Sequence, residues 1–113
     1  MALPRSPSER VQVLAACTGR LSARMEHQWL TDGPASEHTR ALRDHLAEVL
    51  DLILPGTEID TRHAFALRVQ AKQAYAALLR RATFGTDPRE RRTALRVAVR
   101  LEQECRGLLL GQG

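Results

Sequence analysis

The chain has 113 residues, of which 43% are hydrophobic and 27% are charged, and its formal net charge is +4. This length suits one domain with a single core, and the balance of hydrophobic and charged residues excludes a disordered chain. Aromatic residues make up only 4% of the chain, so the core must consist mainly of aliphatic side chains and alanine. Such a mixture favours packed helices over a β-sandwich. We expect one all-α domain over residues 1–113.

The first expected helix covers about residues 7–30. It begins with the sequence Ser6-Pro7-Ser8-Glu9, in which a serine can cap the helix and a proline occupies the first helical position. Apolar and small residues then recur every three or four positions, which indicates one buried face. These are Val11, Leu14, Thr18, Leu21 and Met25. The sequence Thr31-Asp32-Gly33-Pro34 ends the helix.

Two further helices are expected in the middle of the chain, over about residues 37–54 and 58–83. Ser36 is the expected cap of the second helix, which ends at Pro55-Gly56, and Thr57 or Asp60 can cap the third. The third helix is rich in alanine, which allows a close neighbour. It also carries two apolar stripes, more than one core-facing helix needs, and an exposed stripe favours self-association or a protein partner.

The fourth expected helix covers about residues 88–110. It begins with Asp87-Pro88-Arg89-Glu90, a second strong helix start, and its apolar positions are spaced four and three residues apart. Four helices of similar length joined by short loops pack antiparallel to their neighbours. The sequence therefore predicts an up-down-up-down four-helix bundle.

Arginines form one face of the fourth expected helix, at Arg89, Arg92, Arg96 and Arg100. This face could bind a nucleic-acid backbone or an acidic protein, because guanidinium groups neutralise phosphates and carboxylates. An ordinary solvated surface is the simpler interpretation, since acidic residues share the helix and no aromatic residue is available for base stacking. The second helix has an acidic stripe of Asp44, Glu48 and Asp51. The two stripes are complementary and could steer assembly.

His45, Asp60 and His63 are the nearest approach to a metal site, because they flank the Pro55-Gly56 turn at similar distances. A dimetal bundle needs Glu-x-x-His pairs and further inward carboxylates, which are missing. The simpler interpretation makes His45 a boundary residue and Asp60 a favourable anion near a helix N-terminus. We expect no resident cofactor.

Cys17 and Cys105 are too few for a disulfide scaffold, and both lie inside expected helices. They are expected to be reduced in a cytoplasmic protein, although antiparallel first and last helices would place them toward the same end of the bundle. Trp29, at the end of the first helix, could line a small-molecule pocket. No stretch is apolar enough to span a membrane.

A loose pattern over residues 42–109 resembles a group of small, all-helical actinobacterial proteins labelled as natural-product-biosynthesis proteins. It comprises Leu42-Arg43-Asp44-His45 in a helix that ends at Pro55, then Arg62 before an alanine-rich helix, and Cys105-Arg106-Gly107-Leu108-Leu109 after Val97 to Leu101. The resemblance implies an actinobacterial cytoplasm and a biosynthetic setting, and it supplies no reaction.

The sequence predicts a non-catalytic helical protein that associates with itself or with a protein partner. One alternative is a nucleic-acid-associated regulator that uses the arginine face. The other is a small-molecule binder or enzyme with a pocket between helices, near His45 and His63 or near Trp29.

Overall fold

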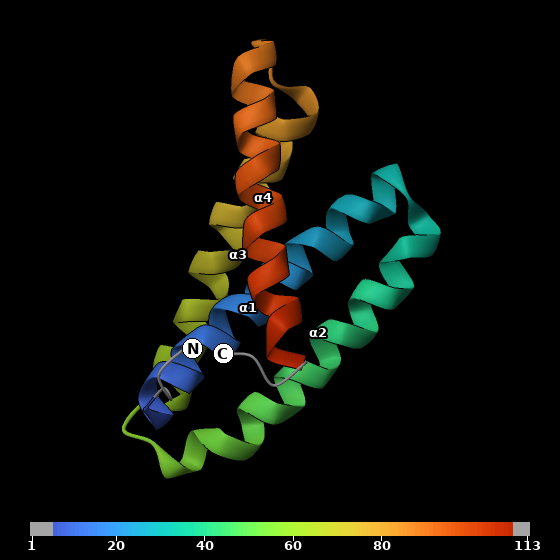
Figure 1. The fold of residues 1–113 in the computed structure, drawn as a ribbon. Helices are drawn as coiled ribbons and strands as arrows, with labels where there is room; N and C mark the ends of the chain where they lie inside the picture. The colour runs from blue at the N-terminus through green and yellow to red at the C-terminus, as the bar shows by residue number, and fades with distance from the viewer. Residues whose placement is uncertain (1–5, 110–113) are drawn as a thin grey trace.

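The computed structural model describes residues 6–109, which form four α-helices and no strand. The helices are α1 (Pro7–Thr31), α2 (Gly33–Ile53), α3 (Thr61–Phe84) and α4 (Pro88–Leu109), and a short 3-10 turn, η1 (Leu54–Gly56), follows α2 (Figure 1). The predicted all-α four-helix bundle is confirmed. The expected end of the last helix at residue 110 lies outside the described residues.

Both predicted proline-containing helix starts are present. Ser6 accepts a hydrogen bond from the backbone N–H of Glu9 at 3.2 Å, and Pro7 is the first residue of α1. Asp87 accepts one from the backbone N–H of Arg89 at 2.9 Å, and Pro88 is the first residue of α4. In each case a polar side chain satisfies a donor that the helix itself leaves free.

The predicted cap of the second helix is wrong, and one of the two predicted caps of the third helix is right. Asp32 caps α2 by accepting from the N–H of Ala35, so Ser36 is not the cap; it lies inside the helix and its hydroxyl donates to the carbonyl of Gly33. Pro34 is tolerated there because a proline in the first turn removes no intrahelical hydrogen bond. For α3 the cap is Asp60, which accepts from the N–H of His63 at 2.7 Å.

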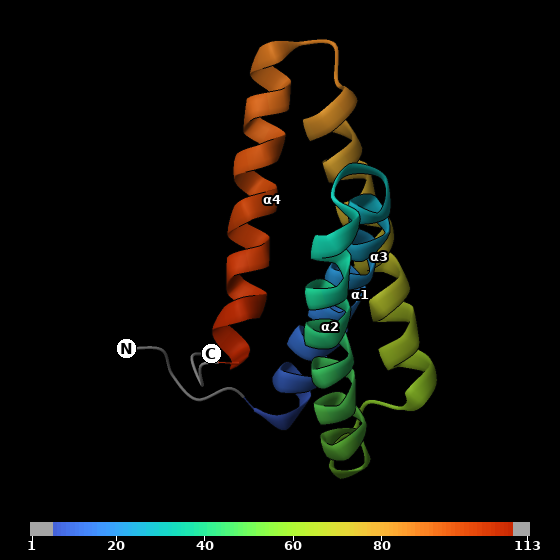
Figure 2. The same cartoon turned by 90° about the vertical axis from the view of Figure 1, so that its right-hand side faces the viewer.

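The four helices alternate in direction, but they do not pack in simple chain order. α1 packs against both α2 and α3, and α4 packs mainly along α3. Figures 1 and 2 show the result as two helical hairpins that diverge toward one end: the α1–α2 connection lies well apart from the α3–α4 connection. The expected packing of α3 beside its chain neighbour α2 is replaced by packing against α1.

Gly19 explains how α1 and α3 approach so closely. A Cβ atom at this position would collide with the backbone carbonyl oxygen of Arg68 and would lie 3.0 Å from the backbone nitrogen of Lys72. A glycine removes this obstacle because it has no side chain. The sequence predicted that the alanines of α3 would allow a close neighbour. The smallest residue at the contact is instead Gly19, which belongs to α1.

The buried residues form two clusters. The larger joins α1, α2 and the beginning of α3 around Val11, Leu21, Leu46 and Leu50, and it includes Cys105 from α4. The second joins α3 to α4 and includes one residue of α1; its members are Ala23, Tyr75, Leu78, Leu79, Ala94 and Ala98. α3 therefore faces α1 on one side and α4 on another.

No helix among residues 6–109 combines the length and apolar character that crossing a bilayer requires.

Candidate functional site

The arginine face of α4 is an exposed surface with an apolar border. Arg89, Arg92, Arg96 and Arg100 are all exposed, and within residues 6–109 none of them makes an ion pair. Beside them, Leu95 is 51% exposed and Val99 44% exposed. We call these six residues the α4 surface. Its arginines were predicted from the sequence, whereas Leu95 and Val99 were missed, although their spacing of four residues was visible.

The outer face of α2 has the opposite charge. Asp44, Glu48 and Asp51 are exposed, as is the neighbouring Leu52. Asp44 is already engaged, since one carboxylate oxygen lies 2.7 Å from a guanidinium nitrogen of Arg43. In the described part of the chain, Glu48 and Asp51 have no ion-pair partner. We call Asp44, Glu48, Asp51 and Leu52 the α2 surface.

The residues considered for metal binding do not form a cluster. His45, Asp60 and His63 are all exposed, and Asp60 uses a carboxylate oxygen to cap α3. Throughout residues 6–109, no three His, Cys, Asp or Glu side chains are placed to hold a metal ion together. The arrangement gives Asp60 a structural role in starting the helix, as the simpler interpretation held.

Trp29 lies on the exposed end of α1, where 60% of its surface is accessible. A shallow hollow of about 450 Å³ lies near the α2–α3 turn and includes Asp60, Pro55 and Ile59 in its lining. Another, of about 230 Å³, is lined by residues of three helices, among them Arg20, Tyr75 and Leu101. Neither hollow includes Trp29, His45 or His63 in its lining.

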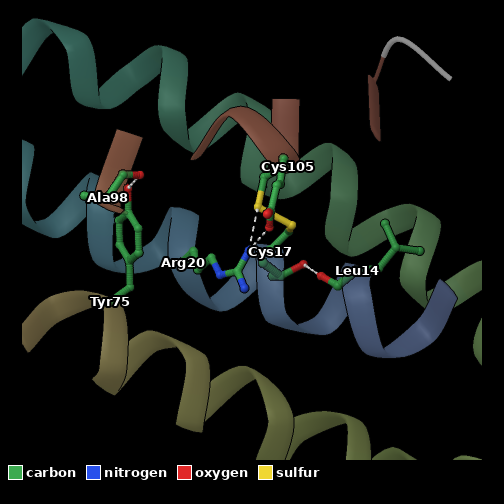
Figure 3. The surroundings of a disulfide bond; sticks show 8 residues. Leu14, Cys17, Arg20, Tyr75, Ala98 and Cys105 are labelled. Carbon is green, nitrogen blue, oxygen red and sulfur yellow. Dashed lines mark hydrogen bonds and ion pairs between the residues drawn. A yellow bond between two sulfur atoms is a disulfide. The ribbon is translucent and has the colours of Figure 1, made fainter. Parts of the chain in front are cut away.

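Cys17 and Cys105 are joined by a disulfide, and both are fully buried. The bond links the first half of α1 to the last turns of α4, with a Cα–Cα distance of 5.4 Å (Figure 3). The expectation that these cysteines are reduced is therefore wrong for this structure. The placement toward one end of the bundle, which the sequence suggested, is what allows the bond.

Charged side chains surround the disulfide on the α1–α4 contact. A guanidinium nitrogen of Arg20 lies 3.7 Å from the sulfur of Cys105 and 3.4 Å from a carboxylate oxygen of Glu104 (Figure 3). Glu102 pairs with Arg24 at 3.6 Å and with Arg106 at 3.2 Å. The Arg20–Glu104 and Arg24–Glu102 pairs and the disulfide join α4 to α1, whereas the Glu102–Arg106 pair lies within α4.

Tyr75 fixes α3 to α4 through a buried hydrogen bond. Its hydroxyl donates to the carbonyl oxygen of Ala98 at 2.8 Å (Figure 3). Burial raises the pKa of Tyr75 to about 12, and the carboxylate of Glu102 adds to this shift. The tyrosine is therefore a neutral donor at ordinary pH, and its role is structural.

Comparison of the chain with protein-family models, with curated proteins and with solved structures gave no match. We therefore infer the function of the protein from the surfaces and contacts of the chain itself.

Proposed function

We propose that this protein is a non-catalytic helical interaction protein that binds another protein chain, a partner or a second copy, through exposed helix surface. The observation that supports this most is the number of large apolar side chains that the described fold leaves at its surface, with exposures between 44% and 82%. They are Trp29, Leu30, Leu52, Phe65, Phe84, Leu95 and Val99.

The α4 surface is the best candidate for the contact. Leu95 and Val99 lie next to arginines on the side of α4 opposite its buried residues. Arginine is favoured at protein interfaces because its guanidinium group makes several hydrogen bonds and also packs against apolar groups. Protein contacts combine apolar side chains with charged ones, and the α4 surface offers both, with Leu95 and Val99 along one flank of the arginines.

The test is a retention experiment with three baits: the wild type, a Leu95→Ser/Val99→Ser variant and a Leu30→Ser control. Each is immobilised and exposed separately to a differently tagged copy of the chain and to an actinobacterial extract. We expect the wild type and the control to retain the same protein, and the double variant to lose at least about 90% of it.

Leu30→Ser is a matched control because Leu30 is also exposed but lies at the far end of α1. Equal retention by all three baits would show that the α4 surface is not the contact. If the wild type retained neither a second copy nor any extract protein above the level of the double variant, the proposed function would be wrong.

A nucleic-acid role is the second candidate, and the four exposed arginines without ion pairs in the described chain favour it. Fluorescence anisotropy with labelled duplex and single-stranded probes tests it. Phosphate binding by four arginines should weaken steeply between about 50 and 200 mM salt. Absence of binding at low salt would remove this candidate.

The biosynthetic setting and the cytoplasmic location are also proposals, supported by the resemblance of residues 42–109 to actinobacterial natural-product-biosynthesis proteins. Comparing metabolites of a producing strain with and without the gene tests the first. Fractionation of the same strain tests the second.

A further inference from the structure

We infer that the occupant of the α4 surface is the α2 surface of a second copy of this chain. This inference rests on the proposed function, because it names the partner for the same surface. It starts from charge: the α4 surface carries four arginines, and the α2 surface carries three carboxylates. Two exposed surfaces of opposite charge on one chain can pair only between copies unless the fold brings them together. α2 and α4 share no extensive contact, and they meet through the buried cluster at Cys105 rather than through these two surfaces.

The spacing of the charges supports this pairing. The carboxylates of α2 recur at four and three residues, at positions 44, 48 and 51, and the arginines of α4 recur at three and four, at positions 89, 92 and 96. If the two helices lie parallel with Asp44 level with Arg89, then Asp51 is level with Arg96. Glu48 then falls within one residue of Arg92, about 1.5 Å along the axis.

The same register aligns the apolar residues. With the charges matched, Leu52 falls level with residue 97, between Leu95 and Val99 on the partner helix. At about 100° per residue, Leu52 lies on one flank of the carboxylates, whereas Leu95 and Val99 lie on the opposite flank of the arginines. When two parallel helices face each other, the left flank of one lies beside the right flank of the other. Leu52 therefore lies on the same side of the contact as Leu95 and Val99 only if the two helices are parallel. Charge and apolar pattern thus select one orientation.

The fold makes a parallel contact easy to form. α2 and α4 both run away from the end at which the two hairpins diverge, although the two helices are inclined to each other (Figure 1). A second copy that is shifted sideways and tilted by this inclination, without being turned over, therefore presents its α4 parallel to α2 of the first. Each copy offers one surface of each kind, so the contact is head-to-tail and can repeat from copy to copy.

The expected association is weak and sensitive to salt. Exposed ion pairs contribute little individually, and Asp44 already pairs with Arg43. Glu48 and Asp51 therefore provide the attraction, together with burial of Leu52, which is 80% exposed in the single chain. Raising the salt concentration from about 50 mM to 500 mM should weaken association at least about tenfold, because it screens these charges.

The experiment is a reciprocal charge reversal measured by sedimentation velocity at low salt. Variant one carries Arg92→Glu and Arg96→Glu, and variant two carries Glu48→Arg and Asp51→Arg. Each should be monomeric alone, because the changed positions now face residues of the same charge in this register. An equimolar mixture should associate again, because each surface of one variant then meets an opposite charge on the other.

The matched control for variant one carries Arg62→Glu and Arg80→Glu, which makes the same change in net charge as variant one but on exposed residues outside both surfaces. It should associate like the wild type, and circular dichroism should show that all variants keep their helices. If the control also became monomeric, net charge rather than this contact would govern association, and the inference would be overturned.

Two other results would also overturn the inference. Neither would overturn the proposed function, which the retention experiment tests separately. Wild-type association that neither variant reduces would mean that the copies meet elsewhere. A wild type that stays monomeric up to about 1 mM at low salt would leave the α4 surface to a different protein, which the retention experiment with extract identifies independently.

Discussion

At the scale of single residues, Gly19 is the position where the packing tolerates least change. A methyl group there meets the backbone of Arg68, which cannot move without shifting α3. We expect Gly19→Ala to destabilise the fold by about 1 to 3 kcal/mol, as overpacking usually does, and thermal unfolding measures it. Gly33→Ala is the matched control because a Cβ atom at Gly33 has open space. Equal midpoints for the two variants would contradict the close α1–α3 contact.

Tyr75 should make stability depend on pH in the alkaline range. Its folded-state pKa of about 12 lies above the ordinary tyrosine value of 10.0, so the folded state keeps the proton longer than the unfolded chain does. The stabilisation is complete below pH 10 and is lost as pH rises from 10 through 12. We expect the wild type to be more stable than Tyr75→Phe at pH 8, by about 1 kcal/mol for the buried hydrogen bond.

The stability difference between wild type and Tyr75→Phe should then shrink between pH 10 and 12. Chemical denaturation of both proteins at each pH measures it, and other alkaline titrations cancel in the difference. A constant difference across this range would show that Tyr75 titrates in the folded state as it does in the unfolded chain.

At the scale of secondary-structure elements, the Cys17–Cys105 bond is the main covalent constraint on α4. It joins residues 88 positions apart, and in the chain-entropy model a loop of this length contributes about 4 to 5 kcal/mol. We expect no free thiols in the denatured protein without reductant. A reductant should lower the thermal midpoint and speed amide hydrogen exchange most in the last turns of α4.

A Cys17→Ser/Cys105→Ser variant provides the control, since its midpoint should not respond to reductant. Two free thiols in the untreated protein, or an unchanged midpoint after confirmed reduction, would contradict the structural role given to this bond.

At the scale of the whole molecule, Leu46 belongs to the cluster that joins three helices. It is 2% exposed, and an aspartate there would place an unpaired charge in the core. We expect Leu46→Asp to lose several kcal/mol, against a total stability of about 5 to 15 for such domains, and circular dichroism should show lost helicity or a much lower midpoint.

Leu101 belongs to the partly buried residues that pack against the second cluster. Leu101→Asp should therefore cost less than Leu46→Asp, and the exposed Leu95→Asp should cost least. A native midpoint for Leu46→Asp would show that the core has been wrongly assigned.

Helix positions were predictable because their causes are local. Ser6-Pro7 and Asp87-Pro88 contain both the cap and the first helical residue, so no distant contact is needed to start α1 and α4. The start of α2 was missed by a few residues because Asp32 and Ser36 are both good caps, and only the observed hydrogen bond distinguishes them. The arginines of the α4 surface were predictable from spacing, whereas the exposure of Leu95 and Val99 depended on which helices cover α4.

The sequence by itself determined four amphipathic helices, their approximate ends and the two charged stripes, because periodicity and capping act within a few residues. Only the tertiary structure decided which helices meet. Gly19 lets α1, in place of α2, lie against α3, and this arrangement leaves α4 beside α3 with its cysteine next to Cys17. Such pairings depend on contacts between residues far apart in the chain, which no local pattern encodes. The same choice decides which apolar side chains stay exposed at the surface.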